Sequence, residues 1–295
     1  MRRSVKVLLT GATSLPGLTL LERLLENHEV RCLVRPDSPN LSRLERSRTE
    51  IVHGDAGDEA SLVRALTGMD AVAHVAGLAF APQVVAAMRR AGVERLLMVG
   101  STSVHSAFEH RSGRRKEMEK LVRESGLAWT IARPTMIYGS ELDRNMRHLL
   151  RFLDRSPVFP LFGTGTNLWQ PVYHEDLARG MLAALENQSA VGRSYDLPGA
   201  APLTYRDLIL TAAGALGRKP HIVHLPLEPV RHALALAERA RLPLPVKSEQ
   251  VLRLREDKAY PYGEAREDLG YKPRPFREGI ALEAARLREI RMVRP

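Results

Sequence analysis

Residues 10–17 read TGATSLPG and directly follow the short apolar run Val5–Leu9. In dinucleotide-binding folds, the turn between the first strand and the first helix carries three glycines. The first allows a tight turn, the second lets the backbone approach the pyrophosphate, and the third lets the helix pack closely on the sheet. Gly11 and Gly17 occupy the first and third places here, whereas Ser14 holds the middle one. The stretch favours a nucleotide-binding turn, in which the Ser14 hydroxyl can donate a hydrogen bond to the phosphate.

The residues after Ser14 suit the start of a helix. Pro16 fits the first helical turn, where its missing N–H has no partner within the helix. A helix that begins near Leu15 points its N-terminal N–H groups at a bound anion. We expect cofactor contacts from Gly11, Thr13, Ser14, Leu15, Pro16 and Gly17.

The first half of the chain alternates apolar runs with amphipathic stretches, the pattern of repeated strand–helix–strand units. It predicts an α/β fold with a Rossmann-type doubly wound parallel sheet, in a nucleotide-binding domain over residues 1–135. The predicted strands are Val5–Leu9, Val30–Val34, Ile51–His53, Ala71–Val75, Leu96–Val99 and Trp129–Ala132. The predicted helices are Leu18–Glu26, Leu41–Arg46, Glu59–Leu66, Pro82–Ala91 and Arg114–Ser125. Asp58 and Thr204 stand where helix N-caps are expected.

Proline, glycine and aromatic residues become frequent after Pro134. We interpret residues 136–295 as a smaller, mixed and mostly helical substrate lobe, of which roughly 170–190 returns to pack on the first domain. HEDLARGMLAALEN (174–187) and YRDLILTAAGALG (205–217) predict amphipathic helices, and HIVHLP (221–226) predicts a strand.

Composition narrows the classes of partner. The 295 residues carry a formal net charge of +10, but the arginines are scattered and aromatic residues make up only 5%. This pattern favours attraction of an anionic cofactor or substrate over specific nucleic-acid binding. Cys32 is the sole cysteine, so no internal disulfide is possible and a cytoplasmic location is expected. With no apolar run of about 18 residues and no signal-peptide pattern, we expect no membrane span.

Arg35 stands where the second strand ends, in the sequence CLVRPDS. An acidic residue at this point would bind the ribose hydroxyls of NAD, whereas a guanidinium suits the 2′-phosphate of NADP. The sequence favours NADP over NAD, although Asp37 could turn toward the ribose instead.

Several further stretches support a resemblance to a known family. They are VHGDAGD (52–58), DAVAHVAG (70–77), RLLMVGSTSVHS (95–106), TIARPTMIYG (130–139), GTGTNLWQPVYHEDLARGMLAAL (163–185) and DLGYKPRPFREGI (268–280). With TGATSLPG, they resemble the short-chain dehydrogenase/reductase superfamily in its extended and atypical branches. Those branches include sugar-nucleotide epimerases, NmrA-like proteins and relatives of a complex I accessory subunit.

The resemblance implies positions for the cofactor and the substrate. Asp55 and Ala56 would lie at the adenine, Val75, Ala76 and Gly77 along the middle of the cofactor, and Pro134 and Thr135 at the nicotinamide. Ser101 would hydrogen-bond the reacting oxygen, and Ser103, Arg111 and Gln170 would bind substrate. Relatives often form homodimers through a helix pair.

Active members of that family also carry Tyr-x-x-x-Lys on the helix after the serine. The spacing places both residues on one helix face, where the lysine lowers the pKa of the tyrosine that transfers the proton. The corresponding positions hold Arg111 and Arg115, or Ser112 and Lys116 one residue later, and arginine is a poor proton donor near neutral pH. Tyr138 is the alternative catalytic residue that we propose beside Ser101, and His105 and His110 are further candidates.

Three functions follow from these patterns. The first is an NADP-dependent oxidoreductase that reduces a carbonyl, quinone or enone and lacks the usual Tyr-Lys pair. The second is a nucleoside-diphosphate-sugar epimerase or dehydratase, and the third is an NADP(H)-binding sensor or assembly factor without turnover. We expect no metal site, since the sequence has no paired-cysteine motif and no His-Glu-x-x-His.

Overall fold

The computed structural model describes residues 4–45, 47, 49–229, 234, 236, 238 and 256–294, apart from the side chain of Arg111. These residues form two compact units. The first unit draws on Met1–Ile137, Val172–Pro198 and Pro261–Pro273. The second draws on Tyr138–Pro171, Gly199–Tyr260 and Arg274–Pro295.

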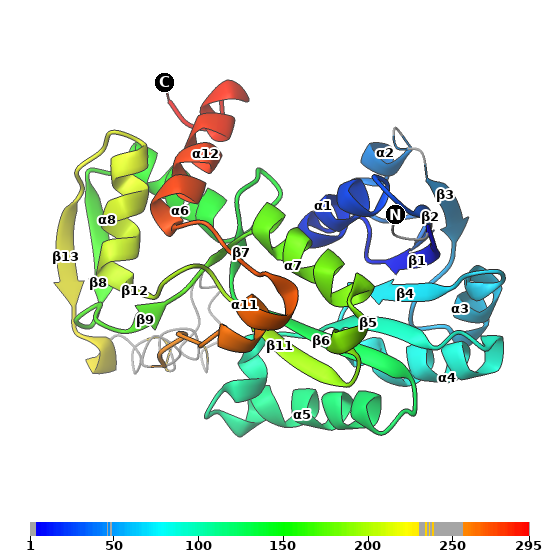
Figure 1. Ribbon diagram of the computed structural model, residues 1–295. Helices are drawn as coiled ribbons and strands as arrows, with labels where there is room; N and C mark the ends of the chain where they lie inside the picture. Colours follow the sequence, from blue (N-terminus) through cyan, green and yellow to red (C-terminus); the bar gives the residue numbers. More distant parts are fainter. Residues whose placement is uncertain are drawn as a thin grey trace. The chain divides into compact units, whose positions relative to one another are not determined.

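A seven-stranded sheet forms the centre of the first unit, with the strand order β11-β6-β5-β4-β1-β2-β3 (Figure 1). The neighbouring strands pair in parallel throughout. The strands are β1 (Lys6–Thr10), β2 (Glu29–Val34), β3 (Glu50–His53), β4 (Ala71–His74), β5 (Arg95–Val99), β6 (Ala128–Pro134) and β11 (Arg193–Leu197). This confirms the predicted Rossmann-type sheet, although the edge strand β11 was not expected from the sequence.

The chain order reverses between β1 and β4. From β1 the sheet grows to one side through β2 and β3, and to the other side through β4, β5 and β6. In such sheets, ligands bind outside the carboxyl ends of the strands at this switch point. The carboxyl end of β1 leads into Gly11 and that of β4 into Val75, so both loops predicted to hold the cofactor begin there.

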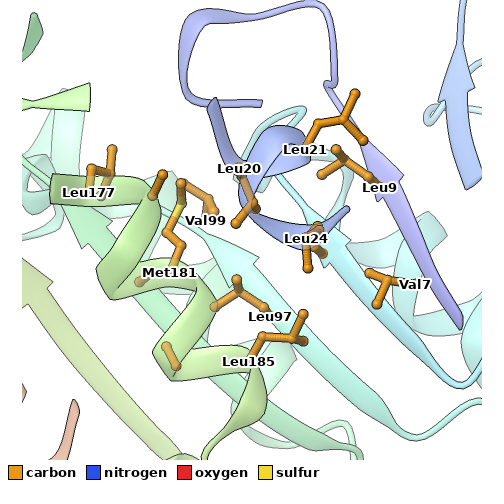
Figure 2. Packing of buried hydrophobic residues seen from close by; sticks show 14 of the residues in the cluster. Val7, Leu9, Leu20, Leu21, Leu24, Leu97, Val99, Leu177, Met181 and Leu185 are labelled. Atoms are coloured by element: carbon orange, nitrogen blue, oxygen red, sulfur yellow. The ribbon is translucent and has the colours of Figure 1, made fainter. Parts of the chain in front are cut away.

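Helices cover the two faces of this sheet, and the alternation of side chains along β1 shows how. Val7 and Leu9 pack in a cluster with α1 (Leu15–Leu24) and α7 (His174–Glu186), as Figure 2 shows. Leu8, between them, belongs to a second cluster on the opposite face. That face is covered by α3 (Glu59–Leu66), α4 (Ala81–Ala91) and α5 (Glu109–Arg123) (Figure 1).

Two helices of the first unit start earlier than the sequence predicted. The helix predicted over Leu18–Glu26 begins at Leu15, because Ser14 caps it. The helix predicted over Arg114–Ser125 begins at Glu109. Asp58 caps α3 and accepts hydrogen bonds from Ala60 N and Ser61 N, as expected. The short α2 (Leu41–Leu44) matches the start of its predicted range, whose last residue, Arg46, lies outside the described residues.

Short elements complete the first unit. They are the 3-10 turns η1 (Leu78–Phe80), η2 (Thr102–His105) and η3 (Gln188–Ala190), the strand β10 (Val172–Tyr173) and the helix α11 (Gly263–Leu269). The two-residue strand β7 (Ile137–Tyr138) spans the point where the chain passes to the second unit.

The described part of the second unit consists of short sheets and helices. Strand β8 (Val158–Phe162) pairs in parallel with β13 (His221–Leu225), and β9 (Leu168–Trp169) pairs antiparallel with β12 (Leu203–Thr204). The helices are α6 (Met146–Arg155), α8 (Tyr205–Ala215) and α12 (Phe276–Glu289). Thr204 caps α8, as predicted. Among the described residues, no helix combines the length and apolar character needed to cross a bilayer.

Candidate functional site

Two glycines allow the close approach of backbone at the end of β1. Gly11 has a φ of +74°, and a Cβ placed on it would lie 2.6 Å from Ala76 N. A Cβ on Gly17 would overlap the carbonyl oxygen of Gly11. Backbone atoms cannot rotate out of the way as a side chain can, so both positions require glycine. The loops that follow β1 and β4 therefore pack directly against each other.

Ser14 closes the turn in the place of the missing middle glycine. Its Oγ donates a hydrogen bond to Gly11 O at 2.8 Å and accepts one from Gly17 N at 3.2 Å. The serine thus acts as the N-cap of α1 and satisfies one of the N–H groups that a helix start leaves open. The Ser14 hydroxyl therefore donates its hydrogen bond to Gly11 O, whereas the sequence suggested that it could donate to a phosphate.

A pocket of about 210 Å³ lies over this turn and contains eight of the predicted cofactor residues. The eight are Gly11, Thr13, Ser14, Arg35, Asp55, Ala56, Val75 and Ala76. Six further residues line the same pocket and were not predicted: Ala12, Leu33, Val34, Ser38, Gly54 and Phe80. Of these, Phe80 and Leu33 offer apolar surface that a base can pack against. A pocket that combines the glycine turn, apolar surface and the cationic Arg35 has the groups that an adenine nucleotide needs.

His74 holds the loops around this pocket together. The ring is fully buried, with Nδ1 2.8 Å from Thr10 Oγ1 and Nε2 2.9 Å from Gly77 O. A carbonyl oxygen only accepts, so Nε2 carries the hydrogen and Nδ1 accepts from the Thr10 hydroxyl. Burial lowers the pKa of His74 to about 4, although the hydrogen bond to Gly77 opposes this. A neutral imidazole thus ties the end of β1 to the turn after β4.

The residues predicted at the reacting end lie at the carboxyl ends of β5 and β6. Ser101 caps η2, and its Oγ accepts hydrogen bonds from Ser103 N at 3.2 Å and from Ser103 Oγ at 2.9 Å. Thr102 Oγ1 donates to Pro134 O at 3.3 Å, which ties this turn to the segment Pro134–Thr135. The structure brings the turn that holds Ser101 and Ser103, after β5, next to Pro134 at the end of β6.

Comparisons with known proteins identify the family of the chain. A family model described as NAD(P)H-binding matches residues 11–188. The chain belongs to this NAD(P)H-binding family. The chain is 31% identical over 288 residues to (4-alkanoyl-5-oxo-2,5-dihydrofuran-3-yl)methyl phosphate reductase of Streptomyces griseus, covering 94% of this chain and 98% of the relative.

Two other proteins widen the comparison. N-acetyl-alpha-D-glucosaminyl-diphospho-ditrans,octacis-undecaprenol 4-epimerase of Escherichia coli O157:H7 is 24% identical over 75% of each chain. The solved UDP-glucose 4-epimerase of Thermotoga maritima shares the fold, with a TM-score of 0.76 and 18% identity over 97% of this chain and 99% of that one. This NAD(P)H-binding chain is thus a member of the epimerase-like, atypical branch of the short-chain dehydrogenase/reductase superfamily.

Helix α5 holds the two residue pairs that the sequence resemblance aligns with the family's Tyr-Lys pair. In the first register, Arg111 lies in the helix with its side chain outside the described residues, and Arg115 is half-buried. In the second register, Ser112 is buried and its Oγ donates to Phe108 O, while the exposed Lys116 pairs with Glu109 at 3.6 Å. Neither register presents a phenol.

A buried carboxylate on α5 instead joins the helix to the sheet. Glu119 is fully buried and binds Arg133 of β6 and Arg123 of its own helix. Arg133 also lies 3.5 Å from Asp196 of β11, which pairs with His105 at 2.9 Å. The sequence analysis did not single out Glu119, Arg133 or Asp196, because no motif marks a partner so far along the chain.

Two predicted site residues belong to the second unit. Tyr138 is fully buried against the ring of Phe276, and its hydroxyl donates to Phe276 O at 3.4 Å. Gln170 is also buried, and its side-chain amide donates to Gly199 O and accepts from Tyr260 N, each at 2.8 Å. These hydrogen bonds all join residues of the second unit.

Proposed function

We propose that this protein is an NADPH-dependent reductase of a small carbonyl, quinone or enone substrate that carries an anionic group. The observation that carries the proposal is the similarity along almost the whole chain to the Streptomyces griseus reductase. The name of that relative's substrate contains an unsaturated oxo ring and a phosphate. The net charge of +10 on the present chain is consistent with an anionic substrate.

The choice of NADP over NAD rests on Arg35. Its side chain is 56% exposed at the edge of the nucleotide pocket, and its Nε lies 3.8 Å from Asp37 Oδ1. Such a distant and exposed ion pair adds little stability. The Arg35 guanidinium can therefore leave Asp37 and bind a 2′-phosphate. Ser38 lines the same pocket and offers a hydroxyl beside it.

Ser101 is the residue that we propose to bind the reacting oxygen. Its Oγ accepts from both the N–H and the hydroxyl of Ser103, so its own hydrogen is left to donate to a substrate oxygen. In this proposal Ser103 has two roles. It holds Ser101 in place through these hydrogen bonds, and it can also contact the substrate itself. When bound between the strand ends, near Pro134 and Thr135, the reduced nicotinamide supplies a hydride. Tyr138 has no catalytic role in this proposal, because its hydroxyl is buried and donates to a backbone carbonyl.

Thermal unfolding with NAD, NADH, NADP and NADPH tests the cofactor assignment. We expect the largest rise in Tm with NADPH or NADP, and Arg35→Asp should abolish that preference while sparing the smaller shift with NAD. Arg90→Asp is the matched control, since Arg90 lies on α4 with a 73% exposed side chain and does not line the nucleotide pocket. A larger shift with NAD than with NADP in the wild type would refute the NADP assignment.

A substrate screen tests the reaction. NADPH absorbance is followed with quinones, enones and phosphorylated butenolides, and we expect at least one to be reduced above the background rate. Tight NADPH binding without any turnover would instead favour the role of a sensor or assembly factor.

The second candidate is a sugar-nucleotide epimerase. The Escherichia coli relative, 24% identical over 75% of each chain, is the observation that favours it. The absence of tyrosine from both registers of α5 counts against it. Epimerisation or binding of UDP-sugars and dTDP-sugars, assayed with NAD present, would decide in its favour.

A further inference from the structure

The loop between β2 and α2, residues 35–40, is tied to the nucleotide turn by one side-chain hydrogen bond. Asn40 Nδ2 donates to Thr13 O at a distance of 3.2 Å, although the two residues lie 27 positions apart in the sequence. Thr13 lines the nucleotide pocket, and so do Arg35 and Ser38 of the loop itself. The hydrogen bond therefore joins two stretches of backbone that both contribute to this pocket.

The backbone of Asn40 is left-handed. Its φ of +64° and ψ of +17° lie in the region that glycine prefers and that asparagine tolerates better than most other residues. Asn40 stands directly before α2, where an asparagine side chain commonly caps the helix, yet it makes no capping hydrogen bond. The side-chain amide thus serves the contact with the nucleotide turn and not the start of its own helix.

The β2–α2 loop has little freedom between its two ends. Pro36 and Pro39 each fix φ at about −65°, and Ser38 N donates to Arg35 O at 3.0 Å, which closes a turn. A loop that is stiffened in this way moves as one piece. Strand β2 holds one end of the loop, and the hydrogen bond of Asn40 holds the other.

The state of this loop before the cofactor arrives affects how tightly the 2′-phosphate is bound. Arg35 and Ser38 are the residues of the loop that offer a guanidinium and a hydroxyl to that phosphate. Ordering a loop during binding lowers the affinity, whereas a loop that is already held in the bound conformation avoids this loss. The hydrogen bond from Asn40 to Thr13 O supplies such a restraint.

We propose that Asn40 is a positioning residue for the 2′-phosphate, and that its hydrogen bond to Thr13 O strengthens the preference of the site for NADP(H) over NAD(H). This inference rests on the proposed NADP-dependent function. The 2′-phosphate is the group that distinguishes the two cofactors, so loss of the hydrogen bond weakens NADPH binding more than NADH binding. The pyrophosphate, which both cofactors share, is expected at the turn that Ser14 closes through its own bonds to Gly11 O and Gly17 N.

The binding test measures Kd for NADPH and NADH by isothermal titration calorimetry in wild type, Asn40→Gly and Asn27→Gly. Glycine adopts the left-handed conformation readily, so Asn40→Gly removes the amide and keeps the backbone. We expect its Kd for NADPH to rise about 3- to 10-fold, as the loss of one hydrogen bond implies. Its Kd for NADH should change less than about 2-fold, and its Tm without ligand should stay close to wild type. Asn27→Gly, at an exposed position after α1, is the matched control and should leave both Kd values unchanged.

Hydrogen exchange in the protein without ligand tests the restraint itself. We expect the backbone amides of residues 35–44 to exchange faster in Asn40→Gly than in wild type, and NADPH to slow them in both proteins. Equal exchange rates in the two proteins without ligand would overturn the role of Asn40, because the loop would then be held by other contacts.

A double-mutant cycle tests whether Asn40 acts through Arg35. Arg35→Ala removes the guanidinium without adding a charge, so Asn40→Gly should weaken NADPH binding less in the Arg35→Ala background than in wild type. Equal losses in the two backgrounds, or equal rises of Kd for NADPH and NADH in Asn40→Gly, would overturn the role of Asn40 and leave the NADP assignment standing. Tighter binding of NADH than of NADPH by the wild type would overturn the NADP assignment, and the role of Asn40 with it.

Discussion

Glu119 accepts two hydrogen bonds from one guanidinium, because Arg133 Nε lies 2.8 Å from Oε1 and Nη2 lies 2.7 Å from Oε2. This pair links α5 to β6 directly before Pro134, where the nicotinamide is expected. Burial alone would lower the pKa of Arg133, but the hydrogen bonds and charges of Glu119 and Asp196 raise it above its usual value. Arg133 therefore keeps its charge inside the protein.

Glu119→Gln should destabilise the first unit. The substitution leaves the buried Arg133 without its main counter-charge, and breaking a buried pair from one side costs about 3–5 kcal/mol. Urea unfolding should show this loss as a lower midpoint. Glu117→Gln, on the exposed face of the same helix, should change the free energy of unfolding by less than about 0.5 kcal/mol. Equal midpoints for the two variants would argue against the importance of the pair.

Gly17→Ala should abolish nucleotide binding. The added Cβ would overlap Gly11 O, so the turn would have to open or α1 to shift, and the stabilisation of the protein by NADPH would be lost. Gly214→Ala is the matched control, because Gly214 lies inside α8 with no atom within 4 Å of the added Cβ. Alanine there should be neutral or stabilise the protein by up to about 1 kcal/mol. Retained NADPH binding in Gly17→Ala would contradict the close packing of the two loops.

The features that the sequence could predict are the local ones. The turn at Gly11–Gly17, the cap at Asp58 and the six apolar strands each depend on residues within a few positions of one another. The first turn of α5 was missed because Ser112 and Gly113 are weak helix formers. The helix forms there because it packs against its neighbours.

The features that the sequence could not predict depend on partners far apart along the chain. Asp196 lies 91 residues from His105, and Thr10 lies 64 residues from His74. No periodicity encodes such pairs. The only sign of a buried polar contact in the sequence DAVAHVAG (70–77) is His74, which stands in a mostly apolar stretch. The sequence of the edge strand β11 is RSYDL, in which Tyr195 and Leu197 are the two apolar residues, so it contains no apolar run that would predict a strand.

His74→Leu should weaken both the fold and the binding of NADPH. Leucine keeps the apolar bulk but leaves the Thr10 hydroxyl and Gly77 O without their partner, at a cost of about 1–3 kcal/mol for buried polar groups. Differential scanning calorimetry should show a lower Tm, and the turn at Gly77 should bind the cofactor less tightly. Asp70→Asn, at the exposed residue just before the same strand, is a control for nucleotide affinity, which it should leave unchanged.

His74 also predicts how stability responds to acid. Its pKa is lowered from an ordinary value of 6.5 to about 4 in the folded protein, so the unfolded chain binds the proton more readily between these values. The contribution is fully present above pH 6.5 and is lost as the pH falls toward 4, with a slope of up to about 1.4 kcal/mol per pH unit for one proton. Urea unfolding between pH 4 and 7 should show a shallower slope in His74→Leu than in wild type. Identical slopes would mean that the ring titrates normally.

Glu283 should give the second unit the opposite response to pH. This carboxyl is fully buried, and its Oε2 accepts from Gly139 N at 2.9 Å. Burial, together with the hydrogen bond and charge of Asp143, raises its pKa from 4.5 to about 10. The folded protein therefore holds a proton that the unfolded chain releases above pH 4.5, and stability falls as the pH rises from 4.5 toward 10. Glu283→Gln mimics the protonated form, so its free energy of unfolding should not fall between pH 5 and pH 8 as that of the wild type does. Glu278→Gln, exposed on the same helix, should keep the wild-type pH dependence. A wild-type loss of stability with rising pH in Glu283→Gln would show that Glu283 is ionised in the folded protein and that Asp143 does not hold its proton.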